Sequence, residues 1–226
     1  MSAGERFLRR LFDEMEKRYR IEREERRAEL REKYGTPIFF VHELLECPHK
    51  REMRRKFPEI EVASMYNPRF VIGWLIEEAV KYLLGVRQEQ YYWDRQIEVN
   101  GEKITIAGGI DSRDPETGKV IEIKYLSSLF NTPHEHHVLQ LRIYLWGVRE
   151  PDGELWMFSP EGVVFIPVQA MSDEELSQLV EPALKGDKIP MWSWECDHCP
   201  FERFCSYSIS KRRVRKGGRN AQEKES

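Results

Sequence analysis

Four cysteines constrain the fold of this 226-residue chain more than any other feature of its sequence. Cys196, Cys199 and Cys205 lie within ten residues of one another, and Cys47 stands alone about 150 residues earlier. Thiolate sulfur is a soft ligand that selects zinc or an iron–sulfur cluster over hard ions such as magnesium. Both kinds of centre accept four cysteines. If all four bind one centre, distant parts of the chain must converge on it, so the cysteines indicate a metal site that closes a domain.

Two disulfides or four free thiols are the alternatives to a metal site. Disulfides are typical of secreted proteins, whereas the first residues run into a charged segment without the apolar stretch of a secretory signal. A chain of this length can also build a core without disulfides. Intracellular hyperthermophile proteins are an exception, and abundant charge (33%) with few Asn and Gln is common in thermophile proteins. We expect a metal site in a cytoplasmic protein.

Length and composition predict one sizeable domain with appendages. No apolar run of eighteen residues is present, so we expect no membrane span. The net charge of −3 does not by itself indicate a nucleic-acid binder.

The first 36 residues are predicted to form a charged helical appendage, a lid or a docking arm. The helix should cover residues 5–34 and end at Gly35-Thr36-Pro37. Its first half carries an apolar stripe at helical spacing, formed by Leu8, Leu11, Phe12, Met15 and Tyr19. Over residues 22–33 opposite charges alternate, which predicts a solvated helix with i,i+4 pairs.

Two further helices are expected before the first strand. One should cover about residues 41–56 and carry Cys47 followed by a basic run, Lys50, Arg51, Arg54, Arg55 and Lys56. This run is either a solvated helix face or a phosphate-binding surface beside the metal site. The other should cover residues 69–85, with a buried side made of Gly73, Ile76, Ala79, Val80, Leu83 and Leu84.

The rest of the chain alternates strands with helices and predicts an α/β fold. Strands are expected at residues 90–99, 104–110, 120–125, 155–158 and 163–168, with Asn100-Gly101 as a hairpin turn. Residues 136–148 have helical spacing. Ser172 should cap another helix, with Glu175 at the capping-box position. Residues 211–226 are basic and then polar, which predicts a disordered tail.

Two carboxylates and a lysine are predicted to converge in the middle of the chain. Asp111 ends one strand, and Glu122 and Lys124 share one face of the next, because side chains alternate along a strand. Carboxylates suit Mg²⁺ or Mn²⁺, and the lysine can orient water or stabilise charge on a phosphate. Taken alone, these residues are also consistent with a turn and an ordinary half-exposed strand face.

The neighbouring helices strengthen the chemical interpretation. Gln140 and Tyr144 lie four residues apart and share a helix face, and Gly73 and Glu77 have the same spacing upstream. Along the chain, a helix with Gly-x-x-x-acid is followed by a strand that ends in Asp, then by a strand with Glu-x-Lys, and then by a helix with Gln-x-x-x-Tyr.

This set of motifs resembles the PD-(D/E)xK nuclease superfamily in its RecB-like branch. The flanking cysteines narrow the resemblance to the iron–sulfur nucleases, and among them to the CRISPR-associated Cas-four proteins. It covers about residues 38–207, and no Walker pattern of a fused helicase is present. The resemblance implies a restriction-endonuclease-like core, a central mixed sheet flanked by helices, within a nuclease domain at residues 37–210. An iron–sulfur lobe and the long N-terminal helix complete the expected fold.

The resemblance also implies roles for individual residues. Asp111 and Glu122 would bind the metal with the backbone carbonyl of Ile123, Lys124 would be catalytic, and Gln140 and Tyr144 would line the active site. The cysteines would hold a structural 4Fe–4S cluster, with 2Fe–2S as the alternative. Lys50, Arg51, Arg54 and Arg55 would bind DNA. One position departs from the pattern: many RecB-like members have His where this chain has Glu77, which is either a ligand or a partly buried helix residue.

The implied function is a Mg²⁺- or Mn²⁺-dependent deoxyribonuclease, an exonuclease on single-stranded DNA, with an additional endonuclease activity left open. Its role would be antiviral defence, trimming pre-spacer ends for the CRISPR integrase complex during spacer acquisition. A non-catalytic iron–sulfur DNA-binding adaptor of that machinery is the alternative. A redox sensor is the third, and only the cysteines support it.

Several other residues are interpreted as structural. The His134, His136 and His137 cluster is expected at a surface helix start, and four cysteines make His49 and His198 unnecessary as ligands. Residues 91–93 are aromatic and are expected in the core, although aromatic side chains also stack on bases. Trp192 and Trp194 are expected to pack the metal lobe.

Overall fold

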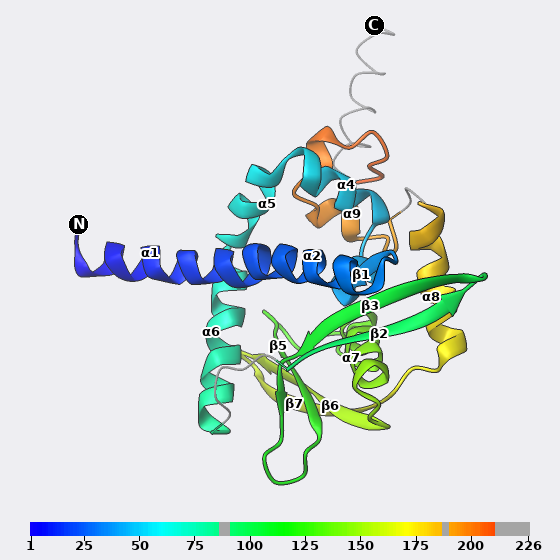
Figure 1. Cartoon of the computed structure of the whole chain (residues 1–226). Helices are drawn as coiled ribbons and strands as arrows, with labels where there is room; N and C mark the ends of the chain where they lie inside the picture. Colours follow the sequence, from blue (N-terminus) through cyan, green and yellow to red (C-terminus); the bar gives the residue numbers. More distant parts are fainter. Residues whose placement is uncertain (86–90, 187–189, 211–226) are drawn as a thin grey trace, which may run out of the picture.

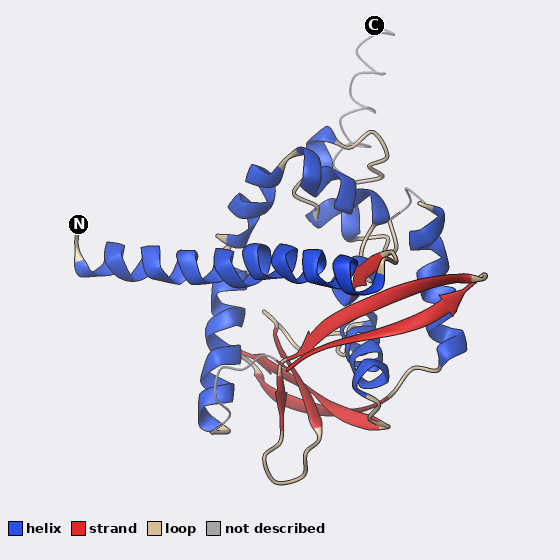
Figure 2. Ribbon diagram, viewed as in Figure 1, coloured by secondary structure: helices blue, strands red, loops and turns tan. Residues whose placement is uncertain are grey.

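The strands form two mixed sheets, where the sequence predicted one central sheet (Figure 2). The computed structural model of the chain describes residues 1–85, 91–186 and 190–210. One sheet has the order β1-β3-β2 and consists of β1 (Ile38–Phe40), β3 (Glu102–Ile110) and β2 (Tyr91–Val99). The other has the order β4-β5-β6-β7 and consists of β4 (Ser112–Arg113), β5 (Val120–Tyr125), β6 (Asp152–Ser159) and β7 (Gly162–Gln169). Each sheet contains one parallel pair, β1–β3 and β5–β6.

The β2–β3 hairpin confirms the turn predicted at Asn100-Gly101. Both residues have positive φ, 54° and 81°, which is the geometry of the two-residue turn that matches strand twist. Position 90, predicted as the first residue of this strand, lies outside the described residues. β3 begins two residues before the expected strand, because Glu102 and Lys103 continue the pairing toward the turn.

Helix α7 (Glu135–Val148) packs between the sheets and fills the main core. Leu141, Ile143 and Leu145 are fully buried against Leu155 and Met157 of β6. Helix α8 (Asp173–Lys185) covers the β2 side, and its predicted cap is confirmed because Ser172 and Glu175 form a reciprocal capping box.

The N-terminal helix is continuous and consists of α1 (Ala3–Glu16), a π-helical turn (Lys17–Ile21) and α2 (Glu22–Tyr34). Its N-terminal end, where residues 1–10 are exposed, projects from the rest of the molecule, and α2 lies beside β1 (Figure 1). Arg27 and Leu30 are buried there, and Arg27 pairs with the buried Glu43 at 2.7 Å. The predicted solvated helix is therefore wrong for this face, because its charges find partners across the fold.

The helix predicted at residues 41–56 is two helices, α3 (Val41–Leu44) and α4 (Pro48–Lys56), and α5 (Pro58–Met65) follows. The break lies at Cys47, because proline disfavours helical backbone at the residue before it. Cys47 is consequently the N-cap residue of α4 and not an interior helix position.

Helix α6 (Pro68–Leu83) buries part of the face predicted for it. Val80 is buried and packs with Ile76 and Leu84 against β5, as expected, whereas Ala79 and Leu83 are exposed. Lys81 is also buried, and apolar periodicity did not indicate this charged residue.

The cysteine-rich segment holds α9 (Glu195–His198) and a short 3₁₀ helix (Glu202–Phe204), and α9 lies near α4 (Figure 1). The tail predicted at residues 211–226 lies outside the described residues. Within the described part of the chain, none of the helices combines the length and the apolar composition needed to cross a membrane.

Candidate active site

Asp111 lies where the chain passes from one sheet to the other, between β3 and β4. Its Oδ2 atom accepts a hydrogen bond from the backbone N–H of Ile123 on β5, at 2.9 Å. The predicted convergence of Asp111 with the Glu-x-Lys strand is therefore present, and a backbone contact fixes it.

Glu122 and Lys124 share one face of β5, as the strand alternation predicted. The Glu122 side chain is only 1% exposed, and its Oε1 atom lies 2.5 Å from Lys124 Nζ. Its other oxygen, Oε2, is buried and has no hydrogen-bond partner. Ile121 and Ile123 point to the opposite face and pack with Val80. A buried carboxylate oxygen without a partner is costly, and this one can accept a cation.

The local electrostatics favour the binding of a positive charge. Burial, followed by the charges of Glu122 and Glu77, raises the pKa of Asp111 well above its usual value. Burial also raises the pKa of Glu122, although Lys124 opposes the shift. Burial disfavours the ammonium of Lys124, yet Glu122 and Asp111 raise its pKa. The negative charge of these carboxylates therefore exceeds the single positive charge that Lys124 supplies.

Glu77 belongs to the same electrostatic cluster but is held by cations. Arg18 lies 2.8 Å from it, and Lys81 contacts the same oxygen from one helical turn away. Arg18 also pairs with Glu78 at 2.6 Å. Burial opposes the charge of Arg18, but Glu77 and Glu78 raise its pKa. Nothing in the sequence pattern indicated Arg18 as a partner of this helix.

Gln140 and Tyr144 extend the polar surface on α7. The Gln140 amide donates to the Tyr144 hydroxyl at 2.9 Å, which confirms that they share a helix face. Burial, together with Glu122 and Asp111, raises the pKa of Tyr144. Gly108 is required at its position because a Cβ there would lie 2.9 Å from atoms of both Tyr144 and Trp93.

A cavity of about 260 Å³ joins these groups, Asp111, Lys124, Gln140 and Tyr144 among them, and the N-terminal helix forms one of its walls. The sequence interpretation missed several lining residues, Arg18, Tyr19, Arg23, Arg26 and His42. Tyr19 was assigned to an apolar stripe, whereas its hydroxyl has a pKa raised by burial and by Glu77. Tyr92 also lines the cavity and is half exposed, contrary to the core position expected, whereas Trp93 is buried.

The four cysteines are gathered into a single lobe around α4 and α9. The Cys47 N–H donates to Glu195 at 2.5 Å, although 148 residues separate them. Trp192 donates to the Leu45 carbonyl at 3.2 Å, as expected of a packing residue in this lobe. Burial raises the pKa of Cys47 to about 11, and the negative charges of Glu195 and Cys196 contribute. All four thiols are free of disulfide bonds.

Among residues 1–85, 91–186 and 190–210, no group of three or more His, Cys, Asp or Glu side chains is already arranged to hold a metal ion. Glu77 and Glu122 are each engaged by cationic side chains. Metal binding at the carboxylates would therefore require these cations to move.

The histidine cluster is more buried than expected. Burial lowers the pKa of His136 to about 4 and that of His137 to about 2, so both are neutral at pH 7. His49 is buried and engages Glu52 at 3.0 Å, which occupies its Nδ1 atom.

The four residues predicted to bind DNA differ in whether other side chains already engage them. Lys50 and Arg54 both pair with Glu46, and Arg54 also reaches Glu61 at 2.9 Å. Arg51 lies over the Phe39 ring, and Arg55 is exposed.

Comparison with known proteins agrees with the family resemblance that these motifs indicated. No family model matches the chain. A curated relative from Saccharolobus solfataricus, the CRISPR-associated exonuclease Cas4, is 26% identical over 178 residues, which are 76% of this chain and 88% of the relative. The chain is therefore similar to this relative over most of its length. The crystal structure of SSO0001 has a TM-score of 0.71 at 24% identity, and the match covers 76% of this chain and 88% of that one. The chain therefore shares the mixed α/β fold of that structure.

Proposed function

We propose that this Cas4-like nuclease is a divalent-metal-dependent deoxyribonuclease whose metal is held by Asp111, Glu122 and the Ile123 carbonyl. The unpartnered, buried Glu122 Oε2 atom is the observation that carries this assignment. The mutual repulsion of Asp111, Glu122 and Glu77 supports it, because a divalent cation would offset that repulsion. Glu77 would join them on release from Arg18.

The bound Mg²⁺ or Mn²⁺ would supply Lewis-acid activation of water for phosphodiester hydrolysis. Lys124 would hold the water or the phosphate from its position beside Glu122. Gln140 would orient Tyr144 through its 2.9 Å hydrogen bond, and the tyrosine would face the substrate from α7. Residues 37–210 would form the catalytic domain.

Single-stranded DNA is the proposed substrate. The candidate cavity lies between the N-terminal helix and the β3–α7 wall, and that confinement suits one strand better than a duplex. Tyr92 is half exposed at this cavity and offers a ring for base stacking. The helix of residues 1–36 would then contribute one wall of the substrate channel.

We propose a structural iron–sulfur cluster, of the 4Fe–4S kind, for the four cysteines. The convergence of Cys47 with the segment of residues 196–205 supports it, as do the raised thiol pKa values of Cys47 and Cys199. The cluster would supply positive charge to the thiolates and hold α4 against α9. Zinc would satisfy the same donors.

The CRISPR association of the S. solfataricus relative supports a cytoplasmic role in spacer acquisition. There the protein would trim pre-spacer ends as a partner of the integrase complex. The same contacts would let a non-catalytic adaptor hold DNA, so catalysis has to be tested directly.

Cleavage of end-labelled single-stranded DNA tests the proposal. Wild type with Mn²⁺ should release products, and Asp111→Ala, Glu122→Ala and Lys124→Ala should each lose activity by about 100-fold or more. Glu181→Ala, which removes a carboxylate on α8 far along the chain, is the matched control and should remain active. Unchanged cleavage by all three variants would refute the site, and strand binding without cleavage under Mg²⁺ or Mn²⁺ would favour the adaptor.

A further inference from the structure

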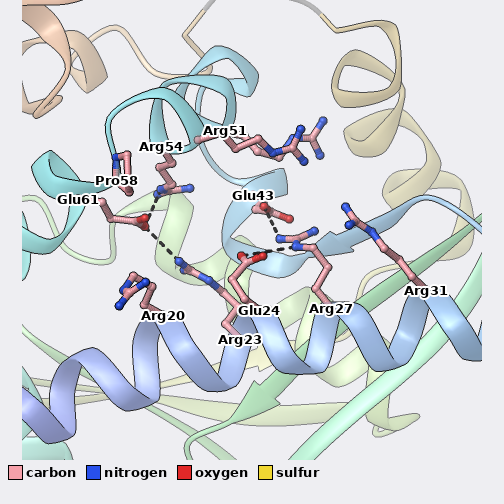
Figure 3. Close-up of a pocket in the computed structure, with 11 residues that line it drawn as sticks. Arg20, Arg23, Glu24, Arg27, Arg31, Glu43, Arg51, Arg54, Pro58 and Glu61 are labelled. Atoms are coloured by element: carbon pink, nitrogen blue, oxygen red, sulfur yellow. Dashed lines mark hydrogen bonds and ion pairs between the residues drawn. The ribbon is translucent and has the colours of Figure 1, made fainter.

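A second cavity, of about 370 Å³, lies between the N-terminal helix and α4. Seven arginines and three glutamates line it, which leaves a net formal charge of +4 (Figure 3). The arginines come from both helices: Arg20, Arg23, Arg27, Arg31, Arg51, Arg54 and Arg55. The volume lies within the range of small-ligand sites.

The three glutamates are already committed to particular arginines. Glu61 pairs with Arg23 at 3.1 Å and with Arg54 at 2.9 Å. Glu43 pairs with Arg27 at 2.7 Å. Glu24 lies 3.7 Å from the same arginine, Arg27. These carboxylates therefore engage Arg23, Arg27 and Arg54. Arg20 pairs with Glu16, which leaves Arg31, Arg51 and Arg55.

Arg31, Arg51 and Arg55 form no ion pair with any residue in the described parts of the chain. Figure 3 shows Arg31 rising from α2 toward the side of the cavity where Arg51 extends from α4. Burial lowers the pKa of Arg51, and the positive charges of Arg55 and Arg27 lower it further despite Glu43. An anion placed among these guanidinium groups would relieve their repulsion.

We propose that this cavity binds a phosphate group of the nucleic-acid strand whose scissile phosphate occupies the candidate active site. Planar guanidinium groups form paired hydrogen bonds with phosphate oxygens, which makes arginine the preferred residue for such sites. Arg23 of α2 lines both cavities, so the two adjoin at this residue. A strand that reaches one cavity can therefore place a neighbouring phosphate in the other.

This inference rests on the proposed function and revises the DNA-binding set predicted from the sequence. Lys50 and Arg54 both pair with Glu46, which already engages them, and leave the set. Arg51 and Arg55 stay in it, and Arg31 joins them from a helix that the sequence interpretation placed in a separate appendage.

The test is binding of a fluorescent oligothymidylate in EDTA, measured between about 50 and 200 mM KCl. Arg31→Ala/Arg55→Ala removes two exposed arginines that make no ion pair in the described ranges, so the fold should survive. Binding should weaken about tenfold or more. The slope of log affinity against log salt should become shallower by roughly 0.7, because one single-strand phosphate contact contributes about 0.7. Arg51→Lys should weaken binding with little change in slope, because lysine keeps the positive charge but cannot form the paired hydrogen bonds of a guanidinium group.

Arg9→Ala/Arg10→Ala removes the same charge from the exposed face of α1 and should leave affinity and slope near wild type. Equal losses in both double variants would overturn the proposal, as would an unchanged Arg31→Ala/Arg55→Ala variant. If that variant instead lost only the binding of an oligoglutamate peptide, the cavity would be a protein-docking site and the proposal would fail.

Strands with and without a 5′-phosphate identify the source of the phosphate. A loss confined to the 5′-phosphorylated strand assigns the cavity to a terminal phosphate, and a loss on both assigns it to an internal phosphodiester. Salt-dependent binding that needs Arg31 and Arg55, in a protein that cleaves nothing, would keep this inference and reject the nuclease proposal.

Discussion

Arg18 of the π-helical turn lies 2.8 Å from Glu77 of α6, on the wall of the candidate active site. The second amino group of the same guanidinium reaches Glu78 at 2.6 Å. π-Helical turns within α-helices are frequent at functional sites. This contact ties the N-terminal helix to α6 and compensates a carboxylate that would otherwise repel Asp111.

Arg18→Met should lower the free energy of unfolding by about 1–3 kcal/mol, because two largely buried carboxylates lose a partner. Chemical denaturation in EDTA measures the change. Arg20→Met is the matched control, since its pair with Glu16 is more exposed and should contribute less than about 1 kcal/mol. Equal losses from the two variants would contradict the assignment of Arg18 as a specific link.

His42 should make the protein less stable in acid. Its Nε2 atom lies 3.2 Å from Arg23, which can only donate, so the imidazole accepts and is neutral. Burial and the charges of Arg23 and Arg54 lower its pKa well below the usual value. The unfolded chain therefore takes up a proton near pH 6.5 that the folded protein does not, and stability falls as pH falls below that point.

The size of this effect is about 1.4 kcal/mol for each pH unit below about 6.5. His42→Gln keeps an acceptor for Arg23 and should lower the slope of stability against pH by this amount between pH 7 and pH 5. His136 and His137, whose pKa values are also lowered, keep their share of the slope. Urea unfolding across this range measures it, and parallel curves for wild type and variant would contradict the prediction.

Cys47→Ala should lose the metal of the cysteine lobe and destabilise the protein, with activity falling as a consequence. Visible absorption with iron, sulfide and zinc analysis measures the loss. His49→Gln should keep the metal, because His49 already engages Glu52. If the wild-type protein is colourless and contains one zinc, the centre is a zinc site and the cluster assignment is wrong. If Cys47→Ala retains its iron, Cys47 is not one of the ligands.

Gly108→Ala should lower stability by about 1–3 kcal/mol, because the new methyl group would overlap Tyr144 and Trp93. Nuclease activity should fall with it as Tyr144 is displaced. Gly4→Ala meets no atom closer than 3.9 Å and should be neutral or slightly stabilising in thermal unfolding. If Gly108→Ala unfolds like wild type, the packing of Tyr144 on this glycine is not a constraint.

Local patterns predicted the parts of the fold that depend on local rules. Strand alternation placed Glu122 and Lys124 on one face of β5, whose bounds match the expected strand, and the capping box at Ser172 formed as expected. The hairpin turn at Asn100-Gly101 followed from its own residues. The meeting of Asp111 with Ile123 required only that neighbouring strands approach.

The features that sequence reasoning missed depend on contacts between distant segments. Arg18 meets Glu77 across 59 residues, and no local pattern pairs them. Arg27 looked solvated because its partner, Glu43, lies beyond the turn after α2. On α6, apolar periodicity indicated the buried Val80 but missed the buried Lys81, whose partner Glu77 lines the candidate site.

The position of Mn²⁺ in crystals grown with the ion, located by anomalous scattering, tests the central claim most directly. We expect an anomalous peak between the carboxylates of Asp111 and Glu122, within coordination distance of the Ile123 carbonyl. Lys124 should be displaced from Glu122. Glu122→Gln crystals should lack this peak. A strong Mn²⁺ site elsewhere in an active protein, with Lys124 still paired to Glu122, would show that Asp111 and Glu122 do not hold the catalytic metal.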